Sequence, residues 1–68
     1  MILIDVKGPD GNIFVILGIF SNIAREKKKR GEDITEYQEL IATFQSMSYD
    51  EILDRIEEIC DEIMFIGR

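Results

Sequence analysis

Apolar and polar residues follow one another along the chain with a spacing that changes from segment to segment. Residues 2–6 form a run rich in β-branched side chains, with Asp5 as its polar member, and this composition is typical of a strand. Residues 8–12, Gly-Pro-Asp-Gly-Asn, then stop the run, because proline fixes φ for a turn and an Asp-Gly pair tolerates positive φ. The start of the chain therefore predicts a strand followed by a turn.

Two interpretations compete for the segment after the turn. Apolar runs on both sides of a Pro-Asp-Gly turn are typical of a β-hairpin. A helical spacing is also present, at Ile13, Ile16, Leu17, Phe20, Ile23 and Ala24. We favour the helix, which Asn12 would cap and Gly31 would end after a basic last turn. Because Phe14, Val15 and Ile19 are apolar as well, we expect this helix to be buried on most of its circumference.

Two more helices are predicted in the second half of the chain. Asp33 with Glu36 approximates a capping box at the start of the first of them, and apolar residues follow at helical spacing. Ser48 with Glu51 is a clearer capping box, because it stands directly before a strongly amphipathic run.

Residues 63–66 (Ile-Met-Phe-Ile) are too continuously apolar for an amphipathic last turn. They are interpreted either as the end of the last helix or as a short strand beside residues 2–6. Together these elements predict an α+β, mostly helical fold, in which an N-terminal strand and three helices pack on one small core. The length predicts a single domain, residues 1–68.

The apolar content is high for so short a chain. Apolar residues make up 46% of the 68 residues. A domain near this size, however, buries only roughly 60% of the surface of its unfolded chain. Either the core is unusually rich, or a partner chain covers some apolar surface. Because homo-oligomerisation is a common remedy for a small core, we expect a homodimer.

The charge and the cysteine usage predict a compartment. A net charge of -6 opposes non-specific attraction to nucleic acids and to anionic membranes. The longest apolar stretch, residues 13–20, is shorter than the roughly 20 residues that cross a bilayer. No leader is visible, and a single cysteine allows no internal disulfide. These features favour a soluble protein of the reducing cytoplasm.

The absence of histidine removes several classes of chemistry. The commonest general base and the commonest metal ligand are missing, so Cys–His and Ser–His pairs and the standard zinc sites are excluded. Paired carboxylates can catalyse glycoside hydrolysis, but they need a cleft for which a core this small leaves little room. We expect no catalysis, no cofactor and no metal. Cys60, on the apolar face of the last helix, is expected to be a core residue.

Two charged surfaces remain as candidate binding sites. The acidic one lies on the last helix and comprises Asp50, Asp54, Glu57, Glu58 and Asp61. Carboxylates about 6 Å apart along a helix can imitate phosphate spacing, although a solvated helix face is the commoner explanation. The basic one is the run 25–30, with Arg25, Lys28 and Lys29 as candidate contacts. These cations interact favourably with the dipole at the end of the helix. They could also bind phosphates or the acidic helix of a second copy.

Several short motifs resemble those of a group of small hypothetical proteins from bacteriophages and prophage-like regions. The residues are Gly8-Pro9-Asp10-Gly11-Asn12-Ile13-Phe14, Leu17-Gly18 and Ser48-Tyr49-Asp50. The resemblance implies the strand, turn and apolar-helix opening and a phage context, and it assigns no activity. From the small core, the apolar excess and the missing catalytic groups, together with this resemblance, we expect a non-enzymatic module that binds a protein of unknown identity through an acidic or apolar surface. The resemblance makes it a phage-type accessory or inhibitor protein. Nucleic-acid binding through residues 25–30, or nucleic-acid mimicry by the acidic helix, is the alternative.

Overall fold

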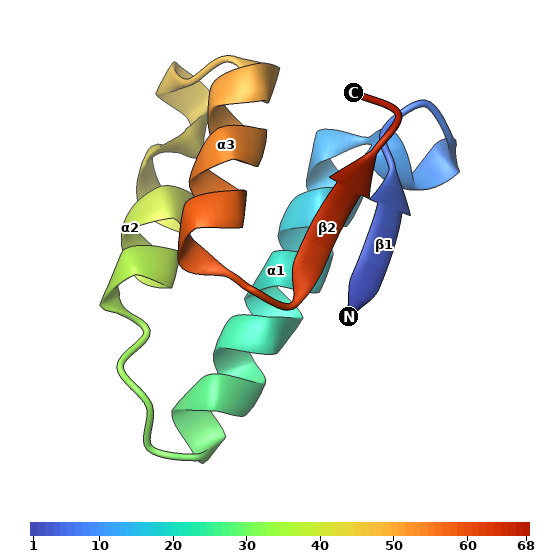
Figure 1. Cartoon of the computed structure of the whole chain (residues 1–68). Coiled ribbons are helices and arrows are strands. Elements are labelled where there is room, and N and C mark those ends of the chain that lie inside the picture. Colours follow the sequence, from blue (N-terminus) through green and yellow to red (C-terminus); the bar gives the residue numbers. More distant parts are fainter.

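The computed structural model describes all 68 residues and has the expected α+β, mostly helical architecture (Figure 1). Its elements in chain order are β1 (Ile2–Asp5), a 3₁₀ turn (Pro9–Gly11), α1 (Ile13–Lys29), α2 (Thr35–Thr43), a second 3₁₀ turn (Phe44–Ser46), α3 (Tyr49–Ile59) and β2 (Ile63–Ile66). None of the helices combines the length and the apolar character that a membrane span requires.

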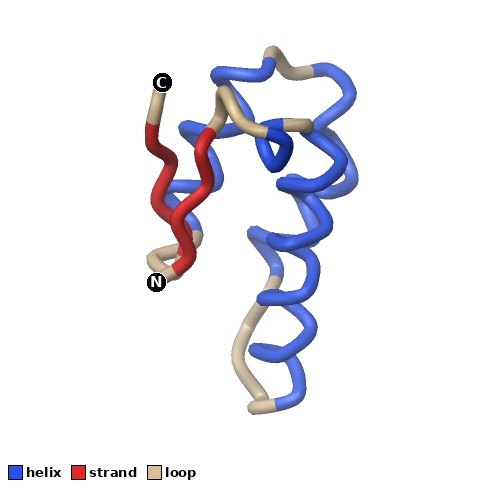
Figure 2. The backbone as a smooth tube through the Cα atoms, turned by 90° about the vertical axis from the view of Figure 1, so that its right-hand side faces the viewer, coloured by secondary structure: helices blue, strands red, loops and turns tan.

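The two ends of the chain form a parallel two-stranded sheet. Ile2 pairs with Ile63 and Ile4 pairs with Phe65, so the strand interpretation of residues 63–66 is confirmed. The sheet lies beside α3, and α1 lies behind it in Figure 1 and to its right in Figure 2. Because side chains alternate between the two faces of a strand, Ile4, Ile63 and Phe65 point into the core.

The segment after the turn is a helix and not the second strand of a hairpin. The Asn12 side chain caps α1 by accepting a hydrogen bond of 2.8 Å from the backbone N–H of Phe14, and Gly31 follows the helix with a φ of 81°. The expectation that this helix is buried on most of its circumference is wrong. Phe14 is 70% exposed and Val15 is 40% exposed, because a sheet of two strands is too narrow to cover both sides of a helix.

Of the two predicted capping boxes, only the second forms. Ser48 Oγ accepts the N–H of Glu51 at 3.2 Å, and the Glu51 carboxylate accepts the N–H of Ser48 at 2.8 Å. Asp33 is not the N-cap of α2, and that prediction was wrong. Its carboxylate accepts hydrogen bonds from the N–H and the hydroxyl of Thr35, at 2.9 and 2.6 Å. This local turn holds the backbone ahead of the helix, so the helix starts at Thr35.

Both strands and all three helices contribute to one apolar core. Its fully buried members include Phe20, whose ring stacks on that of Tyr37 with centroids 4.6 Å apart. Cys60 is 1% exposed, as expected for a core residue. The complete cluster is Ile4, Ile16, Leu17, Phe20, Ala24, Tyr37, Leu40, Ile52, Leu53, Ile56, Cys60, Ile63 and Phe65.

The turn after β1 and the start of α3 are in direct contact. The Tyr49 hydroxyl donates a hydrogen bond of 2.5 Å to the carbonyl oxygen of Gly11. Gly11 is buried, and its backbone lies so close to Val6 that an added Cβ would stand 2.0 Å from the Val6 carbonyl oxygen. Glycine is therefore required here by close packing, since Gly11 does not have a positive φ.

Candidate interaction surface

The acidic face of α3 is partly neutralised by the last residue of the chain. The Arg68 guanidinium lies 2.8 Å from Asp54 and 2.6 Å from Glu57, and 3.7 Å from Asp50. It also donates a hydrogen bond of 3.4 Å to the Asp50 carbonyl oxygen. The pKa of Arg68 is raised, mainly by its hydrogen bond to Asp54. Three of the five predicted acidic contacts thus share one cation.

A glycine allows this contact to form. Gly67 has a φ of 77°, a conformation that L side chains rarely adopt, and it lies between β2 and Arg68. The other two predicted acidic residues lie apart from this cation. Glu58 pairs with Arg55 at 3.0 Å, and Asp61 lies beyond the end of α3 and makes no ion pair.

Most of the basic run is also engaged within the chain. Arg25 donates a hydrogen bond of 3.1 Å to the Asn22 side chain, and Lys29 pairs with Glu26 at 3.3 Å. Of the three predicted basic contacts, only Lys28 is exposed without a side-chain partner. The cations therefore do not form a continuous surface that is free to meet phosphates.

A short ion pair connects the end of α1 to the loop before β2. Lys27 Nζ lies 2.6 Å from the Glu62 carboxylate, and the Lys27 side chain is only 16% exposed. This hydrogen bond raises the pKa of Lys27 and lowers the pKa of Glu62. Glu62 also accepts a contact of 3.5 Å from the Cys60 thiol, whose pKa is raised by burial. Lys27 of the basic run thus binds an acidic residue of its own chain.

Glu62→Gln should remove part of the acid sensitivity of folding. The pKa of Glu62 is below its ordinary value of 4.5 in the folded chain, because Lys27 donates a hydrogen bond to it. Its contribution to the free energy of unfolding is therefore present above about pH 4.5 and is lost as the pH falls through the folded pKa. In urea unfolding followed by circular dichroism, the difference in midpoint between wild type and Glu62→Gln should be largest at neutral pH and disappear in acid.

Glu39→Gln is the matched control for that experiment. Glu39 is an exposed carboxylate without an ion pair, so its variant should follow the wild type at every pH. Equal midpoints of wild type and Glu62→Gln at neutral pH would contradict the stabilising role of the Lys27 contact.

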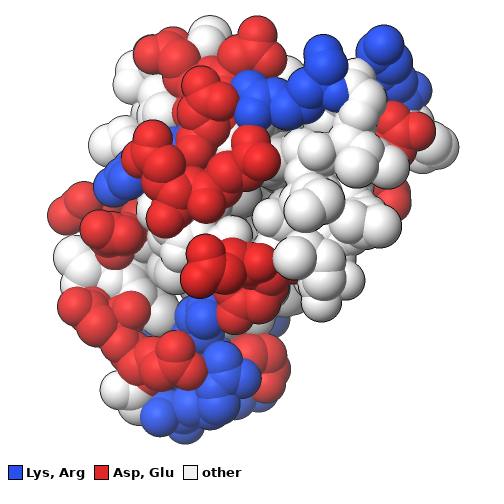
Figure 3. Space-filling model, in the orientation of Figure 1, with Lys and Arg blue, Asp and Glu red and all other residues white.

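The outer face of the sheet is apolar and exposed. Leu3 is 60% exposed, Met64 is 45% exposed and Ile66 is 44% exposed. Leu3 and Met64 are register partners, so they lie side by side on this face. Figure 3 shows an uncharged area over β1 and β2, next to the carboxylates of α3. We call Leu3, Met64 and Ile66 the outer sheet face.

A sequence signal for this face was present. Neither strand alternates apolar with polar residues, except at Asp5. Strands that are apolar on both sides are usually covered on both sides, as parallel sheets nearly always are. Here helices cover only the inner side, so the outer sheet face remains exposed (Figure 2). Exposed apolar surface of this kind makes the outer sheet face a candidate interaction site.

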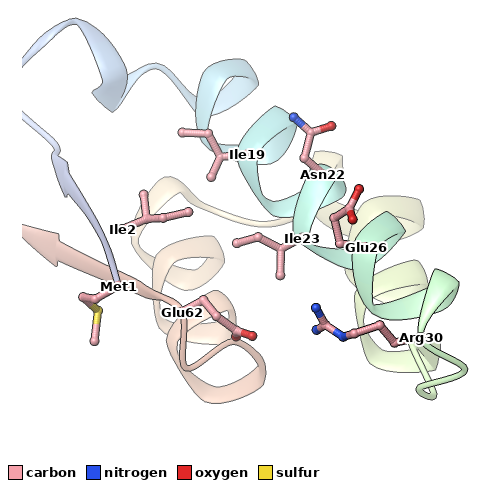
Figure 4. A pocket seen from close by; sticks show the side chains of 8 residues that line it. All are labelled: Met1, Ile2, Ile19, Asn22, Ile23, Glu26, Arg30 and Glu62. Carbon is pink, nitrogen blue, oxygen red and sulfur yellow. The ribbon is translucent and has the colours of Figure 1, made fainter.

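A groove adjoins the sheet at the β1 side. It has a volume of about 520 Å³, and its apolar lining comes from Ile2 of β1 and from Ile19 and Ile23 of α1 (Figure 4). Met1 extends this apolar lining, and the polar members are Asn22, Glu26, Arg30 and Glu62. No three His, Cys, Asp or Glu side chains are grouped so that they could hold a metal ion.

Comparison of the chain with protein-family models, with curated proteins and with solved structures finds no match.

Proposed function

We propose that this protein is a non-enzymatic binding module that recognises another protein through its outer sheet face. The single observation that carries the proposal is the exposure of Leu3, Met64 and Ile66 on one side of the sheet. The sequence resemblance adds a phage-type accessory or inhibitor role in the host cytoplasm. The high apolar content of so short a chain adds a homodimer.

The charges beside the face indicate the chemistry of the partner. The carboxylates of α3 border the uncharged area, and Arg68 compensates only some of them (Figure 3). A partner surface with an apolar centre and a basic rim is complementary to this arrangement. Electrostatic attraction would speed association, while burial of the apolar centre would supply most of the affinity.

Two observations weigh against the nucleic-acid alternatives. Lys27, Lys29 and Arg30 pair with acidic residues of the same chain, which leaves few cations to neutralise phosphates. Arg68 occupies the middle of the acidic face of α3, which interrupts any imitation of a phosphate backbone. The net charge of -6 also opposes nucleic-acid binding, because nucleic acids are negatively charged.

Met64→Lys should abolish capture of the partner and leave the fold intact. A lysine at this exposed position places a charge in the centre of the apolar face, where binding would have to desolvate it. Affinity purification from the native host, with mass spectrometry of the captured proteins, compares the variant with the wild type. A protein that is enriched by the wild type and lost with Met64→Lys is the expected partner.

Ile41→Lys is the matched control. Ile41 is a 38% exposed apolar residue of α2, and its substitution introduces the same charge away from the sheet. The control should capture the same partner as the wild type. Equal capture by Met64→Lys and wild type would refute the assignment of the outer sheet face.

A further inference from the structure

The backbone of β1 has unpaired groups along its free edge. The N–H of Ile2 bonds to Glu62 at 2.6 Å and the N–H of Val6 bonds to Ile66 at 3.0 Å, so every second residue of β1 faces β2. Leu3 follows Ile2 in the strand and faces the opposite way, so its N–H and C=O point to the free edge. Asp5 also faces this edge, but its C=O already accepts the N–H of Gly8 at 3.0 Å.

Side-chain exposure distinguishes the β1 edge from the β2 edge. Ile2 and Ile63 are register partners on the inner face of the sheet. Ile2 is nevertheless 38% exposed, whereas Ile63 is only 4% exposed. The difference arises because Ile2 borders the groove above Ile19 and Ile23, where no further strand covers α1 (Figure 4). The groove is therefore open on the side where a third strand would lie.

The free edge of β1 has little protection against pairing. Natural edges are often protected by lysine, proline or a bulge, and residues Ile2–Asp5 contain none of these; their one charged side chain, Asp5, stands at the end of this short strand. The sheet is also small, since it has two strands of four residues each. Sheets most often have about four to six strands, and two strands alone are marginal. Addition of two strands at this edge would bring the number of strands to four, within this usual range.

We propose that a second copy of this chain pairs its β1 with the β1 edge, antiparallel, about a two-fold axis at Leu3. The Leu3 N–H of each copy donates to the Leu3 C=O of the other, and Ile2 lies opposite Ile4 of the second copy. The strand order is then β2-β1-β1-β2, with the helices of both copies on one side. The inward side chains near the axis, including Ile2, close the groove over Ile19 and Ile23.

Two features of the edge favour a second copy of this chain over a strand from a different protein. The arrangement is self-complementary, because one residue supplies both the donor and the acceptor at the axis. The polar members of the groove carry both signs of charge, from Glu26, Glu62 and Arg30, so identical grooves can meet without uniform repulsion. The net charge of -6 opposes association at long range, and salt screens this repulsion. The dimer should therefore tighten as the salt concentration rises.

This inference deepens the homodimer in the proposed function and rests on it. A two-fold axis perpendicular to the sheet keeps both outer sheet faces on the same side. Leu3 of each copy then adjoins Leu3 of the other, and the two faces become one surface of twice the area. The partner of the proposed function would meet this combined surface.

Cysteine cross-linking tests the geometry directly. In a hydrogen-bonded antiparallel pair the Cα atoms are about 5.5 Å apart, which suits a disulfide. Leu3→Cys should therefore give a covalent dimer in dissolved oxygen. The matched control is Met64→Cys, on the same face but on β2. Its two copies would lie about three strand spacings apart, roughly 14 Å, too far for a disulfide. Native Cys60 is buried in both variants.

Leu3→Pro tests the backbone pairing. The Leu3 N–H takes no part in the β1–β2 ladder, so proline is compatible with the single chain but removes a donor at the axis. In analytical ultracentrifugation the wild type should reach the mass of two chains as concentration rises, and Leu3→Pro should keep the mass of one. If Leu3→Pro does not fold, as judged by circular dichroism, the cysteine pair decides.

Three results would overturn the inference. They are a wild type that keeps the mass of one chain at all concentrations, a folded Leu3→Pro that dimerises like the wild type, and equal cross-linking of Leu3→Cys and Met64→Cys. Met64→Lys separates the two proposals, because it should remain a dimer while losing the captured partner. A dimer without a partner would overturn the assignment of the outer sheet face and leave this inference standing. A captured partner without a dimer would overturn this inference and the homodimer, and leave the outer sheet face standing.

Discussion

Phe20→Ala should lower the free energy of unfolding by about 3–5 kcal/mol. The Phe20 ring is 0% exposed and stacks on Tyr37, so its removal leaves a cavity at the centre of the only core. A domain of this size rarely has more than about 3–5 kcal/mol of stability from its core. The variant should therefore be largely unfolded at room temperature, which loss of the far-ultraviolet circular dichroism of the helices would reveal.

Phe14→Ala makes the same chemical change at an exposed position. Phe14 is 70% exposed and has an edge-to-face contact with Phe44, with centroids 6.4 Å apart. Its loss should lower the free energy of unfolding by less than about 1 kcal/mol. Urea unfolding of the two variants side by side isolates the effect of burial. Similar losses for both would contradict the placement of Phe20 in the core and of Phe14 on the surface.

Gly11→Ala should destabilise the protein by about 3 kcal/mol. The added methyl group would lie 2.0 Å from the Val6 carbonyl oxygen, which is backbone and cannot rotate away. The turn must then move, and this movement disturbs the hydrogen bond from Tyr49 to the Gly11 carbonyl. Thermal and urea unfolding should both show the loss, together with weaker protection of the amides near the start of α3.

Gly18→Ala is the control for Gly11→Ala and should have the opposite sign. An added Cβ at Gly18 meets no atom within 4 Å, and Gly18 lies inside α1. Alanine favours a helix over glycine by roughly 0.5–1 kcal/mol, so the free energy of unfolding should rise by a comparable amount. Destabilisation by Gly18→Ala, or tolerance of Gly11→Ala, would contradict the packing described here.

The elements with strong local signals could be predicted from the sequence. Asn12 and Gly31 mark the two ends of α1, and the reciprocal pair Ser48–Glu51 marks the start of α3. Capping acts between residues two to four positions apart, so its signal is complete within a short window. The prediction from local signals was wrong at Asp33. Its carboxylate accepts hydrogen bonds from Thr35 in a turn, and it is not the N-cap of α2.

The candidate site could be predicted only in part. The sequence places Asp50, Asp54 and Glu57 on one side of a helix, and the structure bears this out because all three contact Arg68. The sequence does not reveal Arg68 as their common cation, because it lies 11 to 14 residues beyond Glu57 and Asp54. Its approach depends on β2 and on the positive φ of Gly67.

The sequence by itself determined which residues are apolar, where α1 begins and ends, where α3 begins, and that β-rich runs stand at both ends of the chain. Only the tertiary structure decided that these runs pair in parallel, which side of the sheet the helices cover, and that Leu3 and Met64 lie together in the open. Gly11 also acquired its close contact with Val6 only in the folded chain. The physical reason is that helical periodicity and capping arise between near neighbours, whereas the pairing of strands some sixty residues apart leaves no periodic trace in either strand.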